Sequence, residues 1–215
     1  MTQEHLVRLV ARIRAAATLY ECDVLSDEWI VSPPCEDLEL EALKAHFGNN
    51  VPQSLLLFFT RTSAHVEFCW YLMGDLPEPF SGINCGELAL SPQLVVAADQ
   101  GRALWTRKVF SDPSNPYDKL WHTCRGLMHL PSGDCIGWDE FERIVYLSHD
   151  GMDTQHGYVL ANSFDDFIHD YLLLGAPAPE FGWSIFTENS ESGISATSET
   201  ARLWIDIFFA DETAD

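Results

Sequence analysis

Four side chains that could hold a metal ion fall within eight residues of one another. They are His149, Asp150, Asp153 and His156, and imidazole and carboxylate groups are common ligands of divalent cations. The same residue types are also ordinary in turns, and this glycine-containing segment follows an apolar run. Its spacing differs from that of an EF-hand loop, which needs alternating acids, a central glycine and a final glutamate. We therefore expect a turn here, with no bound metal or cofactor.

A hydrolase built on His149 and Asp150 is the enzymatic alternative for this segment. The chain has no Gly-x-Ser-x-Gly motif, and Ser148 and His149 would point to opposite faces of a continuing strand. Glycine-rich phosphate-binding loops are also absent from the sequence. The six cysteines have no Cys-x-x-Cys spacing, which favours reduced thiols in the cytoplasm. We expect a protein without enzymatic activity.

The charge of the chain restricts its partners. The 215 residues include 33 acidic and 12 basic side chains, a net charge of −21. Such a chain repels nucleic acid and anionic membrane surfaces, and it attracts basic proteins. Residues 109–215 contribute −15 of this charge, with 19 acidic and 4 basic side chains. This acidic half is either a solubilising surface or a binding face. The sequence shows no signal peptide and no membrane-spanning run, so a cytoplasmic location is expected.

Helical spacing of apolar residues, together with helix-end signals, predicts six helices. They are expected at residues 3–20 and 36–47, from Pro52, from Ser91-Pro92 towards Phe110, at 163–174 and at 196–209. Acidic residues crowd the start of the second helix, and Gly48 is placed to end it. Ser163 with Asp166 makes a capping box. The apolar residues expected to face inward in the last helix are Leu203, Trp204, Ile207 and Phe208.

Short apolar runs predict strands between these helices. They lie at 66–73, Glu87–Leu90, Leu127–Leu130, Cys135–Trp138 and Arg143–Ser148, with an extended stretch at Val24–Val31. Tight turns join the three runs between Leu127 and Ser148, and such turns favour a three-stranded antiparallel meander. Helices, then strands, then helices do not alternate as βαβ units. The expected fold is a single α+β domain with a central antiparallel or mixed sheet flanked by helices. Trp70, Trp121 and Trp138 are interpreted as core residues rather than a stacking platform.

Four blocks in this order resemble the Smi/Knr family of the SUKH superfamily. The first is an apolar helix ending at Gly48, with Pro52 opening the next helix, and the strand containing Trp70 follows. The family's pattern has the same apolar helix, Leu-Pro helix start and tryptophan strand. Lys44 is a departure, because relatives often carry glutamate there. The apolar pattern around that exposed position is intact.

The later blocks extend the resemblance to residues 33–175. Leu120-Trp121 followed by Gly133-Asp134 resembles the family's Gly-Asp turn between meander strands. The segments 145–151 and 161–167 resemble its next strand and closing helix. The residues that match the family pattern, all with structural roles, are Gly48, Pro52, Trp70, Gly133, Asp134, Phe164 and Phe167. The resemblance does not cover the lead-in at 1–32 or the C-terminal extension at 176–215, where a helix is expected to pack on the core.

The resemblance implies a protein that binds another protein. Bacterial members are similar to immunity proteins that neutralise a toxin domain, frequently a nuclease, and eukaryotic relatives look like regulatory or scaffold proteins. Our hypothesis is that an acidic surface within residues 134–166 covers a basic site on a toxin domain. The alternative is an adaptor of the same fold with no toxin, and a homo-oligomer stays open. Candidate contact residues in the meander turns are Asp139, Glu140, Glu142, Asp150 and Asp153.

Overall fold

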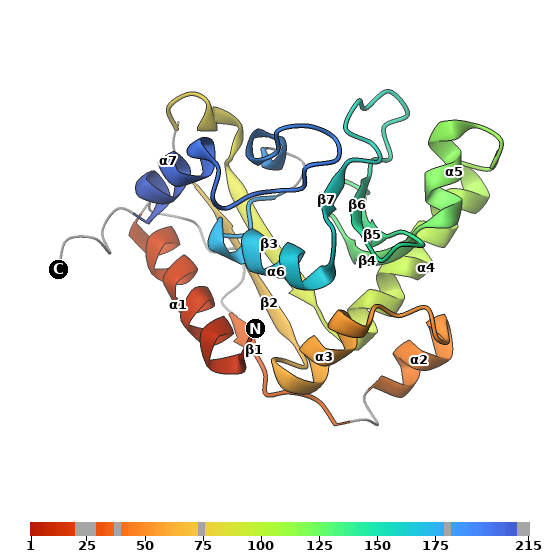
Figure 1. Ribbon diagram of the computed structural model, residues 1–215, viewed down its shortest axis with the longest axis horizontal. Coiled ribbons are helices and arrows are strands. Elements are labelled where there is room, and N and C mark those ends of the chain that lie inside the picture. The colour runs from red at the N-terminus through yellow and green to blue at the C-terminus, as the bar shows by residue number, and fades with distance from the viewer. Residues whose placement is uncertain (20–28, 37–39, 73–75, 179–181, 210–215) are drawn as a thin grey trace.

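A computed structural model describes residues 1–19, 29–36, 40–72, 76–178 and 182–209. It combines seven α-helices with two antiparallel sheets (Figure 1), which confirms the predicted α+β class. No helix within these ranges is both long enough and apolar enough to cross a membrane.

The elements follow one another along the chain with short connections. The helices are α1 (Gln3–Leu19), α2 (Glu41–Phe47), α3 (Gln53–Arg61), α4 (Pro92–Lys108), α5 (Pro116–Thr123), α6 (Phe164–Leu173) and α7 (Glu199–Phe208), with 3-10 helices η2 (Phe80–Gly82) and η3 (Trp183–Phe186). The strands are β1 (Ile30–Val31), β2 (Val66–Tyr71), β3 (Cys85–Leu90), β4 (Arg125–His129), β5 (Cys135–Trp138), β6 (Ile144–Leu147) and β7 (Val159–Ala161).

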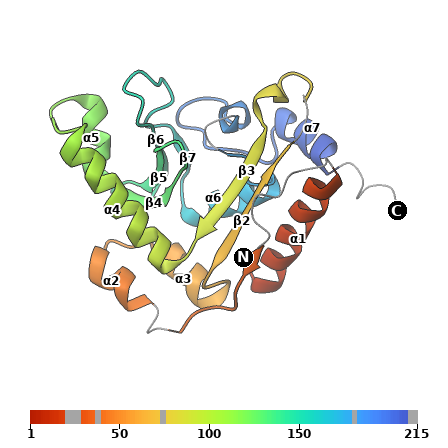
Figure 2. The ribbon, with the colours of Figure 1, turned by 180° about the vertical axis from the view of Figure 1, so that it is seen from behind.

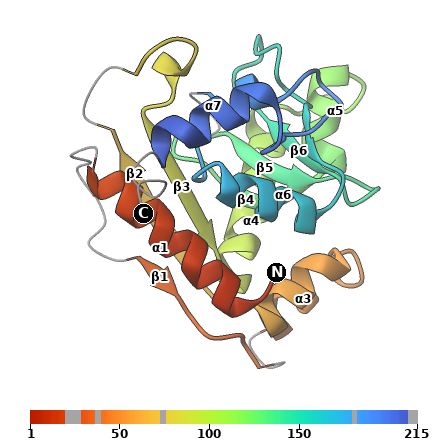
Figure 3. The ribbon, with the colours of Figure 1, turned by 60° about the vertical axis from the view of Figure 1, so that its left-hand side comes forward.

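The first sheet, ordered β1-β2-β3, is covered on one face only. Along β2 the side chains alternate, with Val66, Phe68 and Trp70 buried and the residues between them half-buried. This alternation is typical of an antiparallel sheet with one solvated face. Helices α1, α6 and α7 lie on the buried side (Figure 3), and Figure 2 shows the opposite side of β2 and β3 without a covering helix.

The second sheet, ordered β4-β5-β6-β7, is buried on both faces. One face joins the main core through residues such as Ile136 and Ile144. The other packs Cys135 and Val145 against a smaller cluster that includes Trp121 of α5. Because each face has its own apolar cluster, the sheet is a rigid layer from which its turns project.

The C-terminal helix is an integral part of the core. The Trp204 indole N–H donates to the carbonyl oxygen of Leu174 at 2.7 Å, and the Trp70 indole N–H donates to Gly175 at 2.8 Å. Phe208 packs against Trp70, with ring centroids 4.8 Å apart. Leu203 is 51% exposed, so the expectation that it faces inward is wrong. It lies on the solvent side of a helix whose buried stripe is Ala201, Trp204 and Phe208.

Several element boundaries differ from the sequence prediction. Helix α2 begins at Glu41, and the predicted acidic start at Asp37 and Glu39 lies outside the described residues, as does the stretch 24–28. Pro52 is the N-cap of α3 rather than a first-turn residue, with an extended ψ of 133°. Ser91 and Ser163 cap α4 and α6 as expected, accepting hydrogen bonds from backbone N–H groups.

Two elements were missed in the sequence. Helix α5 begins at Pro116 after Asn115, whose side chain caps it, whereas the sequence analysis expects no helix between Phe110 and residue 163. Strand β7 adds a fourth strand to the meander beside β6. It is three residues long, which is too short for an alternating pattern to be visible.

Candidate functional site

The turn between β5 and β6 displays an aromatic side chain between two carboxylates. Phe141 is 67% exposed, and Glu140 and Glu142 on either side of it are also exposed. Glu142 has a φ of 61°, a left-handed conformation that is uncommon for a residue with a side chain. The turn therefore combines an apolar group with negative charge at a position where another protein could contact both.

Asp139 holds this turn in one shape. Its carboxylate accepts hydrogen bonds from the backbone N–H groups of Phe141 and Arg143, both at 2.9 Å, and from the Arg143 guanidinium at 2.8 Å. Its side chain is only 12% exposed, so this candidate contact residue shapes the turn and offers little of its surface to a partner. Arg143 also reaches Glu191 at 3.2 Å. A turn held in this way loses little conformational entropy when a partner binds it.

The base of the turn is fixed to the helical part of the molecule. Trp138 is buried, its indole N–H donates to the carbonyl oxygen of Asn50 at 3.0 Å, and its ring lies 4.9 Å from that of Phe47. Hollows of about 220 Å³ and 310 Å³ flank the turn, and Asp139 and Glu140 line both. The turn is therefore a ridge with a depression on each side.

The turn between β6 and β7 repeats the pattern with a methionine. Met152 is 90% exposed, between exposed Asp150 and half-buried Asp153. The two carboxylates accept hydrogen bonds from backbone N–H groups, Asp150 from Met152 at 3.1 Å and Asp153 from Gln155 at 2.8 Å. These are the roles of turn residues. Within the described residues, no three His, Cys, Asp or Glu side chains are close enough to hold a metal ion.

The five predicted contact residues do not form one surface. Strand β6 runs from Ile144 to Leu147, so residues 139–142 precede it and residues 150–153 follow it. The two groups consequently lie at opposite ends of the second sheet. Three of the five side chains, those of Glu140, Glu142 and Asp150, are exposed.

His149 pairs with Asp134 and not with its sequence neighbour Asp150. The Nδ1 atom of His149 lies 2.7 Å from the carboxylate of Asp134, which also accepts hydrogen bonds from the His149 backbone N–H and the Tyr146 hydroxyl, both at 2.7 Å. Burial would raise the pKa of Asp134, but these hydrogen bonds outweigh it and hold that pKa below its ordinary value. Asp134 is thus a hydrogen-bond acceptor at a turn, and it also orients a histidine across the sheet.

His156 is a neutral structural group. Its Nδ1 atom accepts a hydrogen bond from the Ser148 backbone N–H at 3.1 Å, and its Nε2 atom lies 3.0 Å from the carbonyl oxygen of Tyr117. The first contact requires an unprotonated Nδ1, so the second nitrogen carries the proton. The ring stacks on Tyr117 at 3.7 Å, and burial lowers the pKa of His156 below its ordinary value of 6.5.

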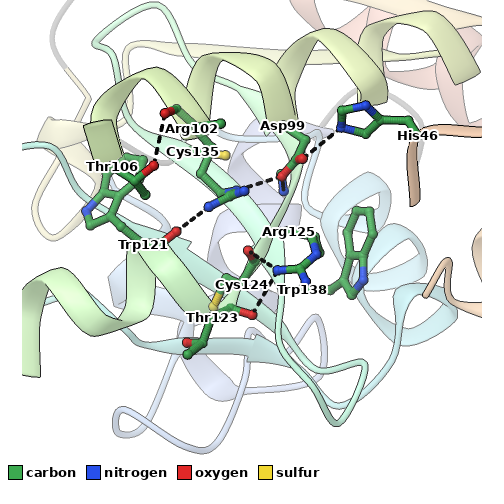
Figure 4. Close-up of polar contacts among 12 residues, drawn as sticks. His46, Asp99, Arg102, Thr106, Trp121, Thr123, Cys124, Arg125, Cys135 and Trp138 are labelled. Atoms are coloured by element: carbon green, nitrogen blue, oxygen red, sulfur yellow. Dashed lines mark hydrogen bonds and ion pairs between the residues drawn. The ribbon is translucent and has the colours of Figure 1, made fainter. Parts of the chain in front are cut away.

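A buried ion pair beneath the second sheet was missed in the sequence (Figure 4). Asp99 and Arg102 of α4 lie 2.6 Å apart. Asp99 also accepts from the Gly126 backbone N–H of β4 and pairs with His46 of α2, while Arg102 donates to the Trp121 carbonyl. Burial would raise the pKa of Asp99, yet Arg102 and the Gly126 N–H hold it below its ordinary value. The pair joins three helices to a strand, which is a structural role.

Comparison with known proteins adds no family to this description. No protein-family model matches the chain, and no curated protein matches it either. The Smi/Knr relationship therefore stays a prediction from the sequence motifs. Of the residues that carry it, Trp70, Phe164 and Phe167 are buried core residues, while Gly48 and Gly133 have positive φ angles at turns.

Proposed function

We propose that this chain is a protein-binding domain that occludes a site on a basic partner, as the resemblance to Smi/Knr-type immunity proteins implies. The observation that carries the proposal is Phe141, which is 67% exposed between Glu140 and Glu142 on a turn held by hydrogen bonds. Aromatic side chains are enriched at the centres of protein interfaces, and a preorganised group loses little entropy on binding.

The negative charge around the turn attracts basic partner proteins in preference to acidic ones. With a net charge of −21, the chain attracts a basic protein from a distance and speeds its association. Glu140 and Glu142 then lie beside the aromatic contact, where cationic side chains of the partner could reach the flanking hollows. A toxin domain with a positively charged active site, of the kind that grips phosphate, has the matching chemistry. The proposed activity is binding rather than catalysis, and the proposed location is the cytoplasm.

The test is a binding experiment with matched variants. Wild-type chain is used to capture proteins from lysate of its native source at low salt, and the captured basic protein is then purified for kinetics. Phe141→Ala should weaken its binding at least tenfold. The double variant Glu140→Lys/Glu142→Lys should slow association and flatten its salt dependence.

The control carries the same charge change elsewhere. Glu4→Lys/Glu78→Lys alters two exposed carboxylates beside the first sheet, and it should lower the association rate much less. If both double variants associated with the partner at the same rate, the slower association would be an effect of net charge alone. Unchanged affinity for Phe141→Ala would remove the turn from the interface and overturn the proposal.

A further inference from the structure

Helix α5 is attached to the β6–β7 turn through three side chains. The Tyr117 hydroxyl donates to the carbonyl oxygens of Ser148 and Asp150. The Trp121 indole N–H donates to the same Ser148 oxygen at 3.2 Å. From the turn, His156 contributes a ring that stacks on Tyr117. The position of the Tyr117 end of α5 therefore depends on the shape of this turn.

His156 can make both of its ring hydrogen bonds only when it is neutral. The Ser148 backbone N–H can only donate, so the Nδ1 atom of His156, 3.1 Å away, must accept with its lone pair. The Nε2 atom lies 3.0 Å from the carbonyl oxygen of Tyr117, which can only accept, so Nε2 carries the proton. A second proton on Nδ1 would set two N–H groups against each other, and the contact with Ser148 would be lost.

The other hydrogen-bonded histidine rings keep their contacts when they are protonated. His122 lies 2.8 Å from the carbonyl oxygen of Phe110 and donates to it in either state. Three rings lie beside carboxylates, where a positive charge strengthens the contact, and these are His46, His65 and His149. Three more rings make no hydrogen bond with any residue that the structure describes, namely His5, His129 and His169. In the described part of the chain, acid therefore disrupts the ring contacts of His156 alone.

The groups that face His156 decide the pH at which this happens. Asp153 in the same turn and Asp134 in the β4–β5 turn favour the protonated ring, but burial outweighs them and lowers the pKa of His156 below 6.5. Tyr117 of α5 stays neutral, because burial raises its pKa to about 12. Among the described residues, no carboxylate accepts a hydrogen bond from the His156 ring. The protonated ring consequently gains no new partner in place of Ser148.

We propose that His156 forms an acid-sensitive contact that holds the Tyr117 end of α5 against the β6–β7 turn, and that mild acid opens it. In the open arrangement the ring reaches water, and its second proton no longer meets the Ser148 N–H. Because the open arrangement binds this proton more tightly, lowering the pH below about 6.5 shifts the equilibrium towards it. The other end of α5 stays tied to α4, where Arg102 donates to the Trp121 carbonyl oxygen. The opening is therefore local and differs from unfolding of the whole chain.

The opening has a consequence for the hollow beside Phe141. Three residues of α5 line that hollow of about 310 Å³, namely Lys119, Leu120 and Thr123. Leu120 also packs closely on the residue after His156, since a Cβ atom added at Gly157 would lie 2.6 Å from its Cδ1 atom. A basic partner bound at the Phe141 turn should therefore dissociate faster in mild acid. This consequence rests on the proposed function, whereas the opening itself does not.

Hydrogen–deuterium exchange of the full chain between about pH 7.5 and about pH 4.5 tests the opening, after correction for the intrinsic pH dependence of amide exchange. In wild type, exchange at residues 119–123 and 148–158 should rise about fivefold relative to α6, which is the effect of one lost hydrogen bond. His156→Gln should abolish the rise, because its amide can accept from Ser148 and donate to Tyr117 without titrating. His122→Gln is the matched control on the same helix, and it should respond to acid as wild type does.

Three results would overturn the proposal. They are the same rise in His156→Gln as in wild type, no rise in wild type over this range, and an equal rise in α6, which would mean global unfolding. The nitrogen chemical shifts of the His156 ring at neutral pH provide a second test on the wild-type chain. They should show a proton on Nε2, and a proton on Nδ1 would also overturn the proposal. Phe141→Ala should leave the opening unchanged while it weakens binding of the basic partner, so the two proposals can fail separately.

Discussion

The β5–β6 and β6–β7 turns, one on each side of β6, look alike in sequence but are stabilised by different contacts. Each displays one apolar side chain, Phe141 or Met152, among carboxylates. The β5–β6 turn is held by the ion pair of Asp139 and Arg143, with oxygen and nitrogen atoms 2.8 Å apart. The β6–β7 turn is held by a neutral histidine, His156, between two backbone groups. A similar surface pattern can thus have different sensitivity to mutation and to pH.

The largest expected effect is at Asp134, whose carboxylate holds the start of the β6–β7 turn through the backbone N–H of His149. Asp134→Ala removes the acceptor of the Tyr146 hydroxyl, the Ser132 hydroxyl and the His149 N–H. Leaving these donors without a partner should lower the free energy of unfolding by about 3 kcal/mol, since each costs on the order of 1 kcal/mol or more. Urea denaturation measures it. Asp134→Asn, which keeps an acceptor oxygen, should lose less, and an equal loss would mean that shape rather than hydrogen bonding is responsible.

A smaller effect is expected at the β5–β6 turn. Asp139→Ala removes three hydrogen bonds that shape the turn, so the free energy of unfolding should fall by about 1 to 2 kcal/mol. Partner binding should weaken as well, although Phe141 itself is unchanged. Glu140→Ala is the control for stability, because its side chain is exposed and makes no hydrogen bond or ion pair with any residue that the structure describes. If both variants were equally stable, the turn would not depend on Asp139.

The smallest effect is the pH response that distinguishes the turns. Burial lowers the pKa of His156 in the folded protein, so the unfolded chain binds more protons once the pH falls below about 6.5. The contribution of His156 to stability is complete above that pH and is lost as the pH falls towards the lowered pKa. Thermal unfolding between pH 7.5 and 5 should show this loss, and His156→Gln should make the profile shallower. If His156→Gln lost stability with falling pH as steeply as wild type, His156 would not be the source of the pH dependence.

The fold was predictable where one local signal dominates. Ser91-Pro92 and Ser163 with Asp166 mark helix starts by hydrogen-bonding chemistry that needs no tertiary contact, and both begin helices as expected. The core tryptophans Trp70 and Trp121 were also predictable, because large apolar groups within strand and helix patterns are rarely exposed.

The features that the sequence analysis missed depend on contacts between segments that are distant in the sequence. The partner of His149 is Asp134, fifteen residues away, because antiparallel pairing of β5 and β6 brings the two neighbouring turns to the same end of the sheet. The pair Asp99–Arg102 looks in sequence like an ordinary surface pair on a helix, and only the packing of α4 on β4 shows that it is buried. The separation of Asp139 and Asp150, in contrast, follows from the sequence, because the strand predicted at Arg143–Ser148 lies between them.

The contact of Phe208 with Trp70 has a consequence for the way the chain is made. Synthesis proceeds from the N-terminus, so Trp70 is incorporated more than a hundred residues before Phe208 is added. During that interval, part of the apolar face of β2 has no cover. We therefore expect the core to close fully only after α7 has been made, and a molecular chaperone that shields apolar strands would have its main opportunity before then.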